Sequence, residues 1–131
     1  MTQKITLQMT PDHHFTLSDG RNIEALNPKE TLLYASLDCL ARTITSLLKE
    51  RISSIKMLEL SLEGSLSTPT VVAESTYTRF HVTYRAECHT TAEESVISRA
   101  INLANEKYCG MLQMLRKIAP MTHEISIVAT N

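Results

Sequence analysis

Glycine, tryptophan and surplus charge are scarce in this chain. Its 131 residues include three glycines and no tryptophan, and no glycine-rich phosphate loop is present, so nucleotide binding is disfavoured. Thirteen Lys and Arg stand against 14 Asp and Glu, a net charge of −1. Without a basic cluster, nucleic-acid binding is a poor interpretation. Cys88-His89 has no second pair at ligand spacing, so we expect no metal and no other cofactor.

Long apolar runs are also absent. No stretch reaches 18 apolar residues, which excludes a helix that spans a membrane. The first ten residues, MTQKITLQMT, lack the apolar core of a signal peptide. We therefore expect a cytoplasmic protein without membrane partners. Three cysteines is an odd number, and a reducing compartment disfavours structural disulfides. The length suits one domain over residues 1–131.

Alternation of apolar and polar residues predicts several strands, as expected of an α+β protein. Strands are expected at 4–9, from Phe15, from Arg21 to Ala25, at 56–63, at 75–88 and around Ile125 to Ala129. The two longest should pair as an antiparallel hairpin. Within 75–88, the alternation assigns Thr78 to the buried face and Tyr77 to the solvated face.

Two helical regions lie between these strands. Asn27-Pro28 provides an N-cap and a first-turn proline for a helix that runs to about Ile52. A capping box from Thr91 to Glu94 predicts the start of a second helix. Cys109-Gly110 should interrupt that helix, and a short helix over 111–117 should follow and end before Pro120.

The first predicted helix has apolar residues on two sides. Its main stripe consists of leucines and one isoleucine at helical spacing: Leu33, Leu37, Leu40, Ile44, Leu47 and Leu48. Cys39 lies about 130° away from that stripe, with Leu32, Ser36 and Thr43 as neighbours. A second copy of the chain would cover this face, which predicts a homodimer. The alternative is that one small core wraps the whole helix.

Cys39 and Cys109 are the two cysteines at positions that suggest chemistry. Cys109 precedes a short helix, whose free N–H groups lower a thiol pKa. Two thiols that meet can reduce a peroxide, since one becomes a sulfenic acid and the other condenses with it. Sequence spacing does not show that they meet, and structural cysteines are the default. Cys88 continues the buried face of its strand and is interpreted as structural.

Two segments that carry these cysteines resemble one known family. Residues 27–39, NPKETLLYASLDC, resemble the first-cysteine helix of the OsmC/Ohr family. Residues 100–109, AINLANEKYC, resemble its second-cysteine helix. The intervening order of helix, two long strands and helix also matches. The resemblance covers about residues 20–129.

This resemblance implies an OsmC-like fold, in which antiparallel sheets pack around a long central helix in an intertwined homodimer. It implies thiol-dependent reduction of organic hydroperoxides or hydrogen peroxide, with Cys39 as peroxidatic and Cys109 as resolving cysteine. Glu30 matches a glutamate that orients an arginine, and Arg21 is the only arginine before the helix. The reductant would be a dithiol, either a lipoyl protein or a thioredoxin. We expect the substrate pocket to include Arg21, Leu32, Ser36 and Met111.

Several departures from the family pattern support an alternative. No arginine-bearing strand is recognisable near the N-terminus. Lys29 follows the proline where the Ohr subgroup has its glutamate, and Gly110 follows the second cysteine where active relatives tend to have proline. The alternative function is a catalytically weak ligand-binding or redox-sensing module with the same fold. A third possibility assigns both cysteines a purely structural role.

Overall fold

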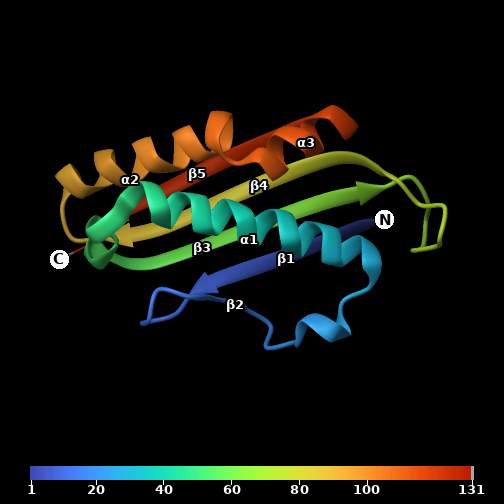
Figure 1. The fold of residues 1–131 in the computed structure, drawn as a ribbon, viewed down its shortest axis with the longest axis horizontal. Coiled ribbons are helices and arrows are strands. Elements are labelled where there is room, and N and C mark those ends of the chain that lie inside the picture. Colours follow the sequence, from blue (N-terminus) through green and yellow to red (C-terminus); the bar gives the residue numbers. More distant parts are fainter. Residues whose placement is uncertain (131) are drawn as a thin grey trace.

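The chain forms one mixed sheet and three α-helices in a computed structural model that describes residues 1–130 (Figure 1). The strands are β1 (Thr2–Met9), β2 (Phe15–Leu17), β3 (Ile55–Leu66), β4 (Tyr77–Cys88) and β5 (Met121–Ala129). The helices are α1 (Pro28–Leu48), α2 (Thr91–Leu103) and α3 (Gly110–Ile118). The α+β prediction is therefore confirmed.

The sheet has the strand order β2-β1-β3-β4-β5. The first three pairings are antiparallel, including the predicted β3–β4 hairpin. The pairing of β4 with β5 is parallel, so the expectation of purely antiparallel sheets is wrong at this edge. The cause is the connection: α2 and α3 carry the chain back along β4, and β5 starts opposite Phe80 with Met121.

The alternation of β4 changes phase near its start. A register shift between Ser65 and Leu66 leaves Leu66 paired with Tyr77 and Ser65 with Arg79. The extra residue, Thr78, is exposed, and Tyr77 is buried. The sequence-based assignment of these two side chains is therefore wrong, because a bulge reverses the faces that simple alternation predicts.

The predicted N-cap of α1 is confirmed. The side chain of Asn27 accepts a hydrogen bond from the Glu30 N–H, and the Glu30 carboxylate accepts one from the Asn27 N–H. The helix ends at Leu48, earlier than expected, because Lys49 adopts a left-handed conformation (φ 55°). A 3₁₀ segment, Lys49–Ser54, follows.

Two other local predictions need correction. The segment expected as a strand from Arg21 to Ala25 contains a 3₁₀ turn, Ile23–Ala25. The capping box of α2 pairs Thr90 with Glu93, one residue earlier than predicted. α2 then passes into a π-helical turn, Ala104–Tyr108, before the break at Cys109.

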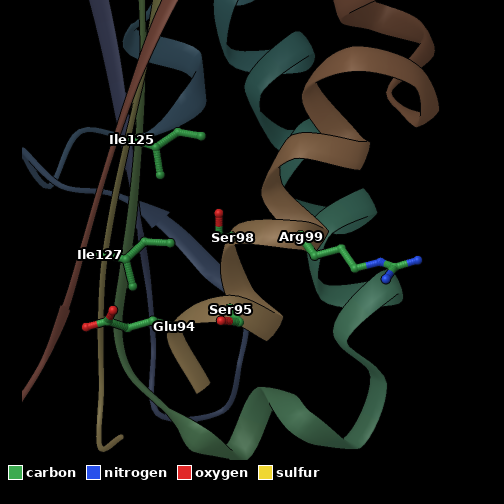
Figure 2. A pocket seen from close by; sticks show the side chains of 6 residues that line it. All are labelled: Glu94, Ser95, Ser98, Arg99, Ile125 and Ile127. Atoms are coloured by element: carbon green, nitrogen blue, oxygen red, sulfur yellow. The ribbon is translucent and has the colours of Figure 1, made fainter. Parts of the chain in front are cut away.

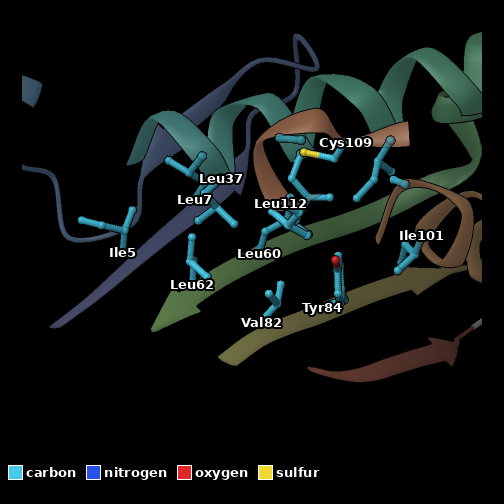
Figure 3. Packing of buried hydrophobic residues seen from close by; sticks show 14 of the residues in the cluster. Ile5, Leu7, Leu37, Leu60, Leu62, Val82, Tyr84, Ile101, Cys109 and Leu112 are labelled. Carbon is cyan, nitrogen blue, oxygen red and sulfur yellow. The ribbon is translucent and has the colours of Figure 1, made fainter. Parts of the chain in front are cut away.

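The helices cover the apolar face of the sheet. α1 packs against β1 and β3, and α2 packs against β4 and β5. Figure 3 shows the layer between them, where Leu37 of α1 meets Leu7 and Leu60 of the strands, all fully buried. This core holds α1 and the α2–α3 break side by side. Within residues 1–130, no helix is both long and apolar enough to cross a membrane.

Candidate thiol site

Two of the three cysteines come together between α1 and the start of α3. The Sγ atoms of Cys39 and Cys109 lie 3.6 Å apart, although 70 residues separate them in sequence. Cys109 is fully buried, whereas Cys39 is partly exposed. The structure records both as free thiols. Only Cys39 is therefore open to an approaching molecule in this chain.

The break in the helix places Cys109. Its N–H donates to the carbonyl of Ala104 (3.0 Å), which closes the π-helical turn, and its carbonyl accepts from the Gln113 N–H in α3. Burial raises the pKa of the Cys109 thiol, and the N–H groups of Leu112 and Met111 at the start of α3 oppose that rise. The helix start does act on Cys109 as predicted, but the net direction is upward because desolvation outweighs it.

An open groove borders Cys39. Eight residues of α1 and the π-helical turn line its roughly 530 Å³: Ala35, Asp38, Cys39, Arg42, Thr43, Ser46, Leu47 and Tyr108. Tyr108 is half exposed, and Arg42 forms an ion pair with Asp38 (2.9 Å) at the rim. The groove gives Cys39 a mostly apolar neighbourhood on its open side.

Glu30 and Arg21 form an ion pair, with Arg21 Nη1 3.2 Å from Glu30 Oε2. Arg21 Nε also contacts Asp19 Oδ2 at 2.7 Å, so the pKa of Asp19 is lowered by hydrogen bonds from Arg21. Nine residues of α1 separate Glu30 from Cys39, which corresponds to about 13 Å along the helix axis. Within one chain, this pair therefore lies away from the two thiols.

The predicted pocket residues have separate locations. Ser36 is fully buried and donates to the carbonyl of Leu32 (2.8 Å), which makes it part of the interior of α1. Leu32 and Met111 are partly buried. None of these three, nor Arg21, lines the groove beside Cys39. Sequence reasoning missed Tyr108, which stands directly before Cys109 and lines the groove.

Other candidate features lie apart from the thiols. Cys88 is fully buried at the end of β4, where its Sγ is 3.4 Å from the carbonyl of Thr90. A second hollow of about 580 Å³ lies between α2 and β5, where Ile125 and Ile127 face Ser98 (Figure 2). It contains none of the predicted site residues. Among residues 1–130, no three His, Cys, Asp or Glu side chains gather as metal ligands.

Comparison with known proteins identifies relatives of the whole chain. Protein YhfA from Escherichia coli (strain K12) is 29% identical over 119 residues, which covers 88% of this chain and 84% of that protein. The OsmC like protein from Mycoplasma pneumoniae has the same fold, with a TM-score of 0.61 and 16% identity over 98% of this chain and 96% of that one. A hypothetical protein from Aquifex aeolicus VF5 superposes with a TM-score of 0.58 and 20% identity over 97% and 96%. The family model for OsmC-like proteins matches residues 19–124, and the chain belongs to that family.

Proposed function

We propose that this protein is a thiol-dependent hydroperoxide reductase that uses Cys39 and Cys109. One observation carries the proposal: two free thiols lie 3.6 Å apart, and Cys39 is partly exposed whereas Cys109 is buried. Membership in the OsmC-like family supports this choice, because the resemblance of both cysteine segments implies thiol chemistry. The difference in exposure supports a first attack by Cys39 and a second by Cys109.

The reaction balances in three steps. The Cys39 thiolate attacks the outer oxygen of ROOH, the O–O bond breaks, and Cys39 sulfenic acid and an alkoxide form; the alkoxide takes a proton to give ROH. The Cys109 thiol then attacks the Cys39 sulfur and displaces hydroxide, which leaves with the thiol proton as water. An external dithiol finally reduces the Cys39–Cys109 disulfide and becomes a disulfide itself. A lipoyl or thioredoxin-type dithiol fits this last step.

The groove beside Cys39 favours an organic hydroperoxide over hydrogen peroxide. Ala35, Leu47 and Tyr108 give its wall an apolar character. Apolar walls bind an alkyl or aryl group and leave the O–O end for the thiol. We therefore expect cumene hydroperoxide to react faster than hydrogen peroxide.

A second copy of the chain would complete the site. The groove lies on the α1 face that carries Cys39, Thr43 and the exposed Ala35, opposite the stripe packed on the sheet. The Glu30–Arg21 pair lies too far along α1 to reach the thiols of its own chain. In an intertwined homodimer, the guanidinium of the same pair in the partner would approach Cys39 and stabilise its thiolate.

The test is a thiol count after one equivalent of cumene hydroperoxide, followed by peptide mapping. The reduced wild-type protein should lose two thiols and gain a Cys39–Cys109 disulfide. Cys39→Ser should react no faster than free cysteine. Cys109→Ser should stop at a sulfenic acid on Cys39 that dimedone traps, and Cys88→Ser should behave as wild type. Unchanged thiols in the wild-type protein would contradict the proposal.

A redox-sensing module is the second candidate, and one observation favours it. Among the described residues, no Lys or Arg donates a hydrogen bond to either thiol, and burial raises the pKa of Cys109. A site of this kind oxidises once and recovers slowly. Steady-state turnover with lipoamide and hydroperoxide separates the two functions, because a sensor gives one turnover and an enzyme gives many.

A further inference from the structure

A buried polar contact links the sheet to the turn that carries Cys109. The Tyr84 hydroxyl of β4 donates to Asn105 Oδ1 at 2.6 Å. Tyr84 is fully buried and Asn105 is 1% exposed. Figure 3 shows the Tyr84 hydroxyl pointing from β4 toward the helical layer in which Cys109 lies. Burial raises the pKa of Tyr84, and a negative charge on the nearby Cys109 would raise it further.

The main chain of Asn105 is held from the other side. Because the Cys109 N–H bonds to Ala104, the carbonyl of Asn105 accepts side-chain donors of α3. Arg116 Nη1 lies 2.6 Å from this oxygen, and Gln113 Nε2 lies 3.3 Å from it. Among the described ion pairs, Arg116 has no carboxylate partner. Its bond to this carbonyl is therefore the polar contact that fixes the side chain.

Asn105 thus joins three elements: β4 through Tyr84, the π-helical turn through its own backbone, and α3 through Arg116. π-Helical turns within α-helices occur frequently at functional sites. An isolated turn of this kind would relax toward regular helix. Regular helix would rotate Cys109 away from α1, since each added residue turns the chain by about 100°.

We propose that Tyr84, Asn105 and Arg116 are positioning residues that hold the π-helical turn and thereby keep the Cys109 sulfur within bonding reach of Cys39. This inference rests on the proposed use of the two thiols and specifies what controls the second step. Disulfide formation requires the sulfurs to approach from 3.6 Å to about 2.0 Å. A turn that is anchored on both sides allows that short movement and prevents the Cys109 sulfur from moving farther away from Cys39.

The test measures the equilibrium between the Cys39–Cys109 dithiol and its disulfide in glutathione buffers, where peroxide is not needed. Tyr84→Phe removes only the hydroxyl, and Arg116→Ala removes the donor to the Asn105 carbonyl. Each should lower the equilibrium constant for disulfide formation about tenfold, because a displacement on the order of 1 Å sharply reduces effective concentration. Arg116→Lys, which keeps one donor, should recover most of the loss.

Tyr77→Phe is the matched control. Tyr77 is the other buried tyrosine of β4, and its hydroxyl donates to Gln3 Oε1 (3.1 Å) and to the Lys29 carbonyl (2.7 Å). The Tyr77→Phe variant loses the same hydroxyl at a place away from the thiols. Its equilibrium constant for disulfide formation should therefore stay within twofold of the wild-type value. An equal drop in Tyr77→Phe, or wild-type values in both Tyr84→Phe and Arg116→Ala, would overturn the inference.

The two proposals fail in different ways. If the disulfide forms in glutathione and responds to Tyr84→Phe, but cumene hydroperoxide is not consumed, then the positioning role stands and the reductase function falls. If hydroperoxide is consumed at the wild-type rate and the disulfide forms with the wild-type equilibrium constant in Tyr84→Phe and Arg116→Ala, then the function stands and the positioning role falls. A wild-type protein that forms no disulfide in either assay overturns both.

Discussion

Two tyrosines of β4 reach into the helical layer, and their surroundings differ. Tyr77 donates to the carbonyl of Lys29 in the first turn of α1, and its ring covers Gly64 of β3. Tyr84 donates to Asn105 in the π-helical turn beside the thiols. Both hydroxyls are hydrogen-bonded and both rings are buried. The same side chain therefore anchors a regular helix at one end of β4 and an irregular turn at the other.

The difference shows where the molecule keeps its reactive groups. The Tyr77 end combines a capping box, the Glu30–Arg21 ion pair and close ring packing. The Tyr84 end combines a helix break, two free thiols and an open groove. An irregular turn and an open groove thus occur where chemistry is proposed, while the other end supplies packing. Four changes test this contrast.

The largest expected effect follows from Gly64→Ala at the Tyr77 end. A Cβ at Gly64 would overlap the Tyr77 ring, whereas a Cβ at Gly110 meets no atom within 4 Å. Gly64→Ala should lower the free energy of unfolding by about 3 kcal/mol. Gly110→Ala, in the first turn of α3, should be neutral or slightly stabilising. Urea unfolding of both variants measures the difference. Equal free energies of unfolding would contradict the proposed difference between the two ends.

Alkaline pH should destabilise the protein through the Cys109 thiol at the Tyr84 end. The pKa of the Cys109 thiol is raised to about 11 by burial, against about 8.5 for an unfolded cysteine. Between these pH values the folded protein holds more protons than the unfolded chain. The contribution of this thiol to the free energy of unfolding is therefore fully present below pH 8.5 and decreases as the pH rises. We expect a loss of up to about 2 kcal/mol between pH 8.5 and 10.

Cys109→Ser is the control for that pH dependence. Denaturant unfolding of this variant should show a much shallower profile from pH 8.5 to 10, because the Cys109 thiol is gone and only the buried Cys88 thiol, whose pKa burial also raises, still contributes. A slope in Cys109→Ser as steep as that of the wild-type protein would assign the pH dependence to another group.

Glu30 tests how far the Tyr77 end depends on its cap. Glu30→Ala removes both the capping contact to Asn27 and the contact to Arg21, and should cost about 1 kcal/mol. Glu30→Gln keeps an acceptor for the Asn27 N–H and should cost about half as much. Thermal unfolding compares the two. Equal losses would mean that the ion pair, rather than the cap, stabilises this turn.

The smallest effect belongs to the rim of the groove. Arg42 is largely exposed and pairs with Asp38 one turn away. Arg42→Ala should change the free energy of unfolding by about 0.5 kcal/mol or less, as exposed pairs on a helix do. Chemical denaturation provides the value. A loss above about 1 kcal/mol would show that the groove rim is structurally coupled to the core.

The sequence predicted the long elements because their patterns are local. In α1, β3 and β4, one apolar periodicity continues for most of the length of the element. The phase of β4 at Tyr77 was wrong because a bulge depends on the partner strand, which alternation does not report. The capping box was misplaced by one residue because Thr90 and Thr91 precede Glu93 and Glu94, so both registers satisfy the same rule.

Prediction of the site was limited by long-range geometry. Cys39 and Cys109 were selected from their positions and from the family resemblance, and their roles stay a prediction. Alternation places Tyr84 on the buried face of its strand, but the contact between Tyr84 and Asn105 has no sequence signal, because it depends on how α2 lies over β4. Leu32 and Ser36 do not line the groove beside Cys39, because helical projection gives the angle of a side chain and not the depth of its packing.

The parallel pairing of β5 with β4 has a consequence for the order of folding. The β3–β4 hairpin closes over a short connection, whereas β5 can pair only after the chain from His89 to Pro120 has returned along the sheet. Contacts that close long loops form late. Cys109 lies within that returning connection, so we expect its sulfur to reach Cys39 among the last events of folding. Thiol pairing during refolding would then report completion of the native topology.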